Sequence, residues 1–231
     1  MKTLGIIGGL GPQTTAKVYL SVVDLVRKSG HDKYPPIIIY NLSFPFILEK
    51  EAIIEGINSE KMLPYLINGA KVLEKAGASF GILPCNTLHK YIKEIRESVR
   101  IPFLSILEET LLKLQSLKVK EIGILATQTT VDSKIYSNIL EKNKIKVMYP
   151  TEDEQVDINK IIVQLLNGKK NQLQDQKIKE VSVSLQKRGA EIILLACTDL
   201  QMAMPEGGNS IPIIDTTEVL IQASVRELIG K

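Results

Sequence analysis

The two cysteines of this chain are the residues whose type and spacing point most clearly to chemistry. Each stands near the end of the same short phrase: residues 77–87 read Gly-Ala-Ser-Phe-Gly-Ile-Leu-Pro-Cys-Asn-Thr, and residues 189–199 read Gly-Ala-Glu-Ile-Ile-Leu-Leu-Ala-Cys-Thr-Asp. A fold built twice, with a thiol at the matching strand end of each copy, brings Cys85 and Cys197 into one cleft. Two such thiols can serve as an acid and a base on opposite faces of one substrate.

Two structural roles compete with this chemical one. A single buried cysteine is commonly a small core hydrophobe, but two at matching positions, each close to a threonine, favour a function. A disulfide between Cys85 and Cys197 is disfavoured, because duplicated units facing each other across a cleft should hold the Cα atoms beyond bonding reach. Two isolated cysteines make no disulfide framework, so we expect reduced thiols in a cytoplasmic protein.

The charge and hydropathy of the chain limit its partners. The formal net charge is +3, and no cluster of lysine and arginine alternates with aromatic residues, so no nucleic-acid partner is expected. No run approaches the roughly 18 apolar residues of a membrane helix, so no membrane span is expected. Residues 1–9 become glycine-rich where a signal peptide would carry its apolar core.

Further repeats indicate two copies of one α/β unit. Gly-Ile-Ile followed by Gln-Thr-Thr at residues 5–15 returns as Gly-Ile-Leu followed by Gln-Thr-Thr at 123–130. Ile-Pro at 101–102 returns at 211–212. Together with the cysteine phrase, these landmarks keep the same order in both halves, which favours an internal duplication.

Short apolar runs alternate with segments of helical period, which predicts parallel sheets flanked by helices. The predicted strands lie near 4–7, 36–40, 80–83, 102–106, 121–125, 145–148, 191–195 and 212–214. The predicted helices lie at 14–28, 59–76, 87–98, 107–117, 132–142, 155–167 and 174–188. We therefore expect an α/β fold of two pseudo-symmetric lobes, with the active site in the cleft between them. The predicted N-terminal lobe combines residues 1–100 with 211–231, and the predicted C-terminal lobe covers 101–210.

Both cysteines and two loops are predicted to share one edge of the fold. Cys85, Cys197 and the loops at 8–12 and 126–130 each follow a strand and precede a helix, and open parallel sheets bind ligands beyond the carboxyl ends of their strands. An ordinary thiol has a pKa of about 8.5, so little thiolate is present at neutral pH. Backbone N–H groups at helix starts, and the polar residues after each cysteine, are expected to lower that pKa.

Other patterns are less specific. Residues 8–12, Gly-Gly-Leu-Gly-Pro, fail the spacing of a dinucleotide-binding loop and no P-loop lysine follows, so they either let the backbone approach a small ligand or form a tight turn. His89 falls one helical turn after Cys85 and could pair with it, although a solvent-facing position is favoured. His31 is the only other histidine, so no zinc site is expected. The acidic run at 151–155 fits a cleft-side cluster or a helix start equally well.

Six segments together resemble the aspartate/glutamate racemase superfamily and, within it, the aspartate racemase branch. They span nearly the whole chain in the family's order. The resemblance implies a two-lobed pseudo-symmetric α/β fold, commonly a homodimer, that racemises a small amino-acid substrate without pyridoxal phosphate, metal or another cofactor. The six segments are 8–12, 84–87, 126–130, 150–155, 196–199 and 212–215.

The resemblance also implies roles for individual residues. One cysteine, as the thiolate, removes the proton from Cα, and the other, as the thiol, returns a proton to the opposite face, which assigns Cys85 and Cys197 as the catalytic acid/base pair. Other residues would hold the α-carboxylate or amino group or line the pocket. These substrate-binding residues are Leu10, Asn86, Thr87, Thr130 and Thr198.

One departure from the family pattern bears on the substrate. Aspartate racemases carry an arginine in a Pro-x-Arg segment after the second strand, which grips the side-chain carboxylate, but residues 41–48 hold no cation. A lysine expected on a later helix, near Asn167, is also absent. Phe46 and Ile47 cannot make a bidentate grip on a carboxylate and would suit an apolar or longer side chain. If the substrate is a dicarboxylate, the candidate replacements are Lys50, Lys90 and Lys160.

Other functions on the same scaffold stay open. A maleate-type isomerase of a small dicarboxylate can keep two cysteines, whereas an arylmalonate-type decarboxylase keeps one, so the pair Cys85 and Cys197 argues against the decarboxylase. A non-catalytic amino-acid-binding module is the alternative from another class, although a sensor has no need of paired thiols. The sequence therefore predicts a cofactor-independent amino-acid racemase for aspartate or a related amino acid.

Overall fold

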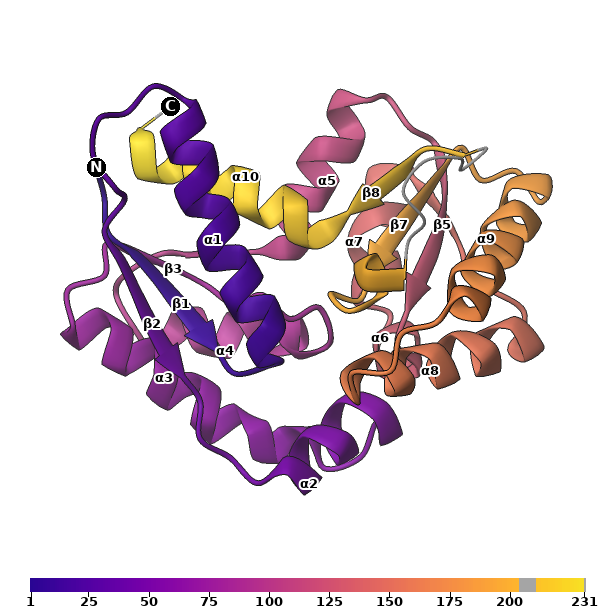
Figure 1. Cartoon of the computed structure of the whole chain (residues 1–231), viewed down its shortest axis with the longest axis horizontal. Helices are drawn as coiled ribbons and strands as arrows, with labels where there is room; N and C mark the ends of the chain where they lie inside the picture. The colour runs from indigo at the N-terminus through magenta and orange to yellow at the C-terminus, as the bar shows by residue number, and fades with distance from the viewer. Residues whose placement is uncertain (204–210, 231) are drawn as a thin grey trace.

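Two four-stranded parallel sheets organise this computed structural model, which describes residues 1–203 and 211–230 (Figure 1). The first sheet has the strand order β2-β1-β3-β4 and the second the order β6-β5-β7-β8. The same order in both sheets confirms the expected α/β fold of two pseudo-symmetric lobes. The strands are β1 Leu4–Gly8, β2 Ile37–Asn41, β3 Phe80–Ile82, β4 Phe103–Leu104, β5 Glu121–Ala126, β6 Lys146–Met148, β7 Ile192–Ala196 and β8 Ile213–Asp215.

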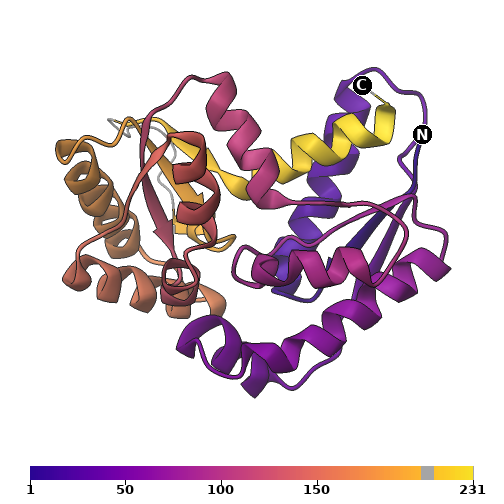
Figure 2. The ribbon, with the colours of Figure 1, turned by 180° about the vertical axis from the view of Figure 1, so that it is seen from behind.

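Helices cover both faces of each sheet, as the two opposite views show (Figures 1 and 2). Every residue of β1 and β7 is buried, which explains why these strands are apolar throughout rather than alternating. No helix in residues 1–203 and 211–230 is long and apolar enough to cross a membrane. The α-helices are α1 Pro12–Lys28, α2 Phe46–Glu49, α3 Leu63–Lys75, α4 Ile92–Glu97, α5 Ile106–Ser116, α6 Gln128–Asp132, α7 Ile135–Leu140, α8 Glu152–Leu166, α9 Gln172–Lys187 and α10 Thr216–Ile229.

Shorter helical turns extend several of these helices. The predicted helices are confirmed to within a few residues. No helix was predicted at residues 46–55, where α2 continues into the π-helix η1. The acidic run at 151–155 is a helix start, because Thr151 and Glu154 cap α8 reciprocally. The turns are the π-helix η1 Lys50–Glu55 and the 3₁₀ helices η2 Ser59–Met62, η3 Thr87–Tyr91, η4 Glu141–Asn143 and η5 Leu200–Ala203.

The last helix, α10, connects the two lobes. It contacts α1 of the first lobe and α5, which follows β4, and the backbone N–H of Lys2 donates to the carbonyl oxygen of Leu228 at 3.1 Å. One continuous apolar core runs through both sheets and includes Leu4, Ile122 and Leu220. The two sheets are therefore held by a shared core rather than by a linker.

Two strands belong to the opposite lobe from the one expected from the sequence. β4, expected with residues 101–210, pairs with β3 in the first sheet, and β8, expected with residues 1–100, pairs with β7 in the second. Each sheet is thus completed by the strand that follows the Ile-Pro landmark of its own copy. The chain crosses between lobes after β4 and again after β8.

The strand that leads to Cys85 packs tightly because it contains Gly81. Gly81 pairs with Phe103 in the parallel ladder, and the buried phenyl ring lies across the glycine. A Cβ at position 81 would lie 2.3 Å from Cζ of Phe103, closer than real atoms approach. The end of β3, and with it the position of the cysteine, depends on this small residue.

We predict that Gly81→Ala lowers the free energy of unfolding by about 1–3 kcal/mol, because the methyl group overpacks the ring. Urea unfolding followed by circular dichroism measures the change. Combining Gly81→Ala with Phe103→Leu, which removes the contacted ring atoms, should restore part of the loss. Equal stability of Gly81→Ala and the wild type would contradict this account of the packing.

Candidate active site

A small cavity lies at the carboxyl ends of the strands of both sheets and contains both cysteines. Its volume is about 20 Å³, which is room for about one water molecule. Within the described residues, no group of three or more His, Cys, Asp or Glu side chains is placed to hold a metal ion. The lining residues are Leu10, Gly11, Glu49, Ile53, Cys85, Asn86, Thr87, Thr127, Leu166, Cys197, Thr198 and Asp199.

Cys85 lies between β3 and the 3₁₀ helix η3. Its thiol is free and 6% exposed, and the backbone N–H groups of Leu88 and Thr87 donate to it. Burial raises the pKa of the Cys85 thiol to about 12, and these two donors oppose the rise without cancelling it. The nearby carboxylate of Glu49 adds to the rise.

Cys197 occupies the matching position between β7 and η5. Its thiol is also free and nearly buried, and it accepts hydrogen bonds from the backbone N–H groups of Asp199 and Leu200. Burial, followed by the charge of Asp199, raises the pKa of the Cys197 thiol, and Cys85 contributes to the same rise. The expected lowering of the thiol pKa values is therefore wrong for this closed cavity: the donors are present, but loss of water outweighs them.

The same cavity is lined by two carboxylates for which no role was predicted from the sequence. Asp199 follows the Cys-Thr pair, and Glu49 ends α2. Burial raises the pKa of Asp199 to about 6. Burial, followed by the charge of Asp199, also raises the pKa of Glu49, so the two groups are close enough to repel each other.

Three threonine hydroxyls form a buried cluster beside Cys85. The Oγ1 atom of Thr87 lies 3.0 Å from Oγ1 of Thr130 and 3.2 Å from Oγ1 of Thr127, and the last two are 2.9 Å apart. Thr127 lines the cavity, whereas Thr130, the predicted binding residue, is not part of the lining. Thr87 and Thr127 are thus the members of the cluster that line the cavity.

Asn86 is held in a chain of buried hydrogen bonds between the lobes. The hydroxyl of Tyr136 donates to its Oδ1 at 2.5 Å, and its Nδ2 donates to Oγ1 of Thr216 at 3.1 Å. Thr216 in turn donates to the carbonyl oxygen of Leu195 in β7 at 2.9 Å. The side chain of Asn86 is engaged by protein groups, so its position is fixed from both lobes.

His89 is buried, and the expectation of a solvent-facing position is wrong. Its Nδ1 lies 2.7 Å from the carbonyl oxygen of Cys85, and its Nε2 accepts a hydrogen bond from the backbone N–H of Ile106 at 3.0 Å. The Nε2 acceptor requires a neutral ring that donates through Nδ1. Burial lowers the pKa of His89 to about 4. His89 therefore fixes the backbone of Cys85 rather than pairing with its thiol.

The glycine-rich loop after β1 forms part of the cavity wall, and a role of Leu10 in substrate binding stays a prediction. Leu10, which is 4% exposed, and Gly11 line the cavity. The Oγ1 of Thr15 accepts from the N–H of Gly9 at 3.1 Å and donates to the carbonyl oxygen of Gly11 at 3.2 Å. Gly9 has a φ of +97°, which a residue with a side chain rarely adopts.

A helical segment of residues 46–55, made of α2 and η1, closes the cavity. Glu49 and Ile53 of this closing segment line the cavity, whereas Phe46 and Ile47 are 90% and 58% exposed. The Oγ1 of Thr129 donates to the carbonyl oxygen of Ile53 at 3.0 Å. The segment thus reaches from the first lobe to α6 of the second (Figure 1).

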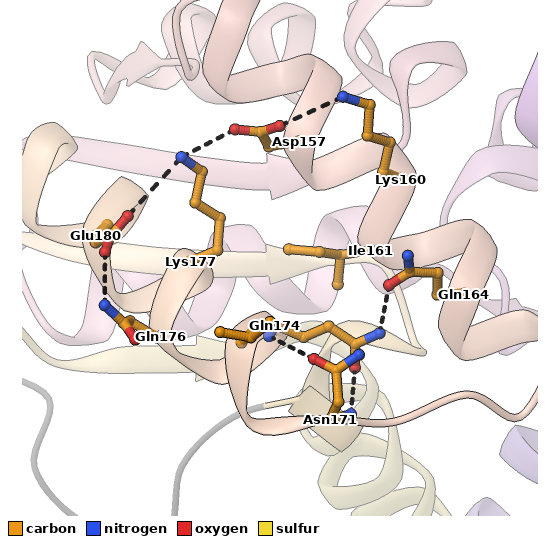
Figure 3. Close-up of a pocket in the computed structure, with 10 residues that line it drawn as sticks. Asp157, Lys160, Ile161, Gln164, Asn171, Gln174, Gln176, Lys177 and Glu180 are labelled. Carbon is orange, nitrogen blue, oxygen red and sulfur yellow. Dashed lines mark hydrogen bonds and ion pairs between the residues drawn. The ribbon is translucent and has the colours of Figure 1, made fainter.

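None of the three lysines considered as replacements for the missing arginine lines the cavity. Lys50 pairs with Glu55 at 2.7 Å, and Lys90 donates to the hydroxyl of Ser59. Lys160 points toward Asp157 in a surface groove between α8 and α9 (Figure 3). Near Asn167, the residue that does line the cavity is Leu166.

Comparison with known proteins agrees with this fold. The sequence profile of Asp/Glu/Hydantoin racemases matches residues 7–224. The chain therefore belongs to the Asp/Glu/Hydantoin racemase family and is an enzyme of the racemase class. A curated relative is the broad specificity amino-acid racemase RacX of Bacillus subtilis, which is 32% identical over 227 residues covering 96% of each chain.

Solved structures of similar proteins share the whole two-lobed fold. A putative Asp/Glu racemase from Yersinia pestis is 26% identical with a TM-score of 0.88, over 99% of this chain and 100% of that one. The Picrophilus torridus aspartate racemase is 29% identical with a TM-score of 0.81, over 100% and 95%. An aspartate racemase homologue from Pyrococcus horikoshii has the same identity and TM-score over 100% of both chains.

We predict that His89 makes the stability of the protein fall on acidification. Its pKa is near 6.5 in the unfolded chain and about 4 in the folded one, so the unfolded state binds an extra proton between these values. The stabilisation is complete above pH 6.5 and is lost as the pH falls toward 4, by about 3 kcal/mol. Urea unfolding at pH 7, 6, 5 and 4 measures this loss.

In His89→Gln, the pH dependence of unfolding in this window should be shallower than in the wild type. His31→Gln, which changes the histidine in the loop after α1, is the matched control and should keep the wild-type slope. An unchanged slope in His89→Gln would show that other groups cause the acid sensitivity.

Proposed function

We propose that this chain is a cofactor-independent amino-acid racemase in which Cys85 and Cys197 are the acid/base pair. The observation that carries the proposal is that the thiols follow equivalent strands of two sheets and line one closed cavity. Inversion at a carbon needs proton donors and acceptors on both of its faces. The name of the curated relative, a broad specificity amino-acid racemase, supports the choice of amino acids as substrates.

In this mechanism the α-carbon of the substrate lies between the two sulfur atoms. The thiolate of one cysteine removes the α-proton and becomes a thiol, leaving a carbanion whose charge spreads into the α-carboxylate. The thiol of the other cysteine donates its proton to the opposite face and becomes a thiolate. The product is the mirror image of the substrate, and the two cysteines have exchanged protonation states, so the opposite enantiomer is processed in reverse.

The substrate itself can supply the positive charge that the thiols lack. Both thiol pKa values are raised by burial and by the charges of neighbouring carboxylates. An α-ammonium group paired with Asp199 would cancel the charge next to Cys197 and so favour its thiolate. The hydroxyls of Thr87 and Thr198, two residues of the lining, are donors suited to the α-carboxylate.

Substrate entry requires the cavity to open. Pockets for small molecules typically measure about 300–1,000 Å³, far more than the roughly 20 Å³ of this closed form. The contact between Ile53 and Thr129 is the connection that must break if the closing segment moves away from the second lobe. Closure after binding would keep water from the carbanion.

Incubation in deuterium oxide with single enantiomers of a panel of amino acids, aspartate included, tests the two-thiol mechanism. Wild-type protein without added cofactor should incorporate deuterium at Cα and racemise at least one member of the panel. Cys85→Ser and Cys197→Ser should each lose about 10²–10⁴-fold in the racemisation rate. Each variant keeps one thiol, so it can exchange the α-proton of one enantiomer at most. The enantiomer that exchanges should differ between the two variants.

Thermal unfolding of both serine variants controls for loss of structure. Both should unfold close to the wild-type temperature, because replacing sulfur with oxygen removes little volume. Racemisation by either serine variant at the wild-type rate would exclude the two-thiol mechanism. Exchange with no member of the panel would exclude an amino-acid racemase and would favour the dicarboxylate isomerase or the binding module. Maleate included in the same panel separates these two.

We also predict that Asp199 sets an acid limit to activity. Its pKa of about 6 means that the carboxylate is protonated below this pH and no longer pairs with an ammonium group. The kcat/KM of the wild type should therefore fall as the pH decreases through about 6, and Asp199→Asn should lower kcat/KM at pH 8 and flatten this limb. Asp157→Asn, which alters a carboxylate of the α8–α9 groove, should keep the wild-type profile, whereas an unaltered acid limb in Asp199→Asn would assign it to another group.

A further inference from the structure

The cavity that holds the two thiols is acidic. Its lining carries the carboxylates of Glu49 and Asp199, and no lysine, arginine or histidine side chain among residues 1–203 and 211–230 lines it. The whole chain has a net charge of +3, so this acidity belongs to the cavity and not to the composition. Like charges repel at short range in a poorly hydrated site, so such a lining disfavours a substrate with an anionic side chain.

Asp199 is the more buried of the two carboxylates. Its residue is 8% exposed, and its carboxylate makes no hydrogen bond or ion pair with another described residue. A buried carboxylate that has no partner among the described residues is costly unless another group pairs with it, and a bound ammonium group would supply that partner. Asp199 is two residues after Cys197, so the cationic group closest to the reacting carbon, the α-ammonium, is the one it is placed to meet.

Glu49, on the closing segment, is a second carboxylate that pairs with no residue in the part of the chain that the structure describes. It is half-buried and lines the cavity, and no described residue pairs with it. The other acidic residues of this segment have partners: Glu51 accepts a hydrogen bond from Asn58 at 2.9 Å, and Glu55 pairs with Lys50 at 2.7 Å. Glu49 therefore differs from Glu51 and Glu55 in two ways: it lines the cavity, and it has no partner among the described residues.

One ammonium group cannot neutralise two carboxylates. The hydroxyls of Thr87 and Thr198 in the lining can donate to the α-carboxylate of an amino acid, so a neutral amino acid would leave Glu49 unpaired, and aspartate would add an uncompensated negative charge. A second ammonium group at the end of the side chain balances the site. Three aliphatic residues of the lining, Leu10, Ile53 and Leu166, suit the methylene stem of such a side chain.

We propose that Glu49 determines the substrate by pairing with the side-chain ammonium of a basic amino acid, of the lysine or ornithine type. Asp199 takes the α-ammonium of the same molecule. This inference rests on the racemase function proposed above and adds the class of side chain to it. Glu49 also lies on the segment that closes the cavity, so pairing of its carboxylate with the substrate would favour the closed form.

The test compares the α-proton exchange and racemisation of lysine, ornithine, norleucine and aspartate by wild type and two variants. Norleucine has the stem of lysine without its terminal ammonium. In the wild type, kcat/KM for lysine or ornithine should exceed that for aspartate by at least about 100-fold. Glu49→Gln should lower kcat/KM for the basic amino acids by about 10–100-fold, mainly through KM, because a charged hydrogen bond is lost. The value for norleucine, which has no terminal ammonium to pair with Glu49, should fall much less than the values for the basic amino acids.

Glu55→Gln is the matched control, because it removes one carboxylate from the same segment at a residue that does not line the cavity. It should leave all four substrates unchanged. Glu49→Arg provides a gain of function, since the reversed charge should raise the ratio of aspartate to lysine turnover by about 10-fold or more. A gain of this kind requires a folded protein, so it cannot result from loss of structure.

The outcomes separate this inference from the function on which it rests. Exchange of aspartate in preference to basic amino acids by the wild type would overturn the role of Glu49 and leave the racemase intact. An equal loss for lysine and norleucine in Glu49→Gln would overturn it too, by showing that the carboxylate does not recognise the side chain. Exchange of no amino acid at all would instead reject the racemase proposal.

Discussion

The facing carboxyl ends of two parallel sheets are the constraint on which the rest of this structure depends. All strands of a parallel sheet run in the same direction, so their carboxyl ends lie at one edge of the sheet. The loops that follow β1, β3, β5 and β7 therefore converge. The shared apolar core and α10 hold the two edges against a single cavity. Small displacements of either sheet would separate Cys85 from Cys197, which explains why buried contacts such as those of Asn86 and His89 fix the backbone around the thiols.

The chemistry of the cavity follows from the burial of its ionisable groups away from water. Burial raises the pKa values of both thiols and both carboxylates, so the closed site disfavours every negative charge that the proposed mechanism uses. A zwitterion with additional positive charge would relieve that cost on entry, and the resulting thiolate would form only when substrate is present. Substrate recognition and activation of the base would then be one electrostatic event.

The sequence contains enough information for the fold and the thiol pair, but not for the whole site. Continuous apolar runs identified the strands, and the repeated phrase placed Cys85 and Cys197 at equivalent positions. Glu49 was missed because α2 is too short to show a helical period, and its direction is set by contact of the closing segment with the other lobe. His89 was misplaced because its burial depends on the carbonyl of Cys85 and the N–H of Ile106, which only tertiary packing brings together.

The position of α10 has a consequence for how the chain is made. The helix contributes Leu220, Ile221, Val225 and Leu228 to the core that also contains β1 and α1, yet it leaves the ribosome after every other helix that the structure describes. Part of the apolar surface of the first lobe therefore stays uncovered until α10 has been synthesised. Completion of this core thus follows the synthesis of α10, and the emerging first half is the stage at which a chaperone would act.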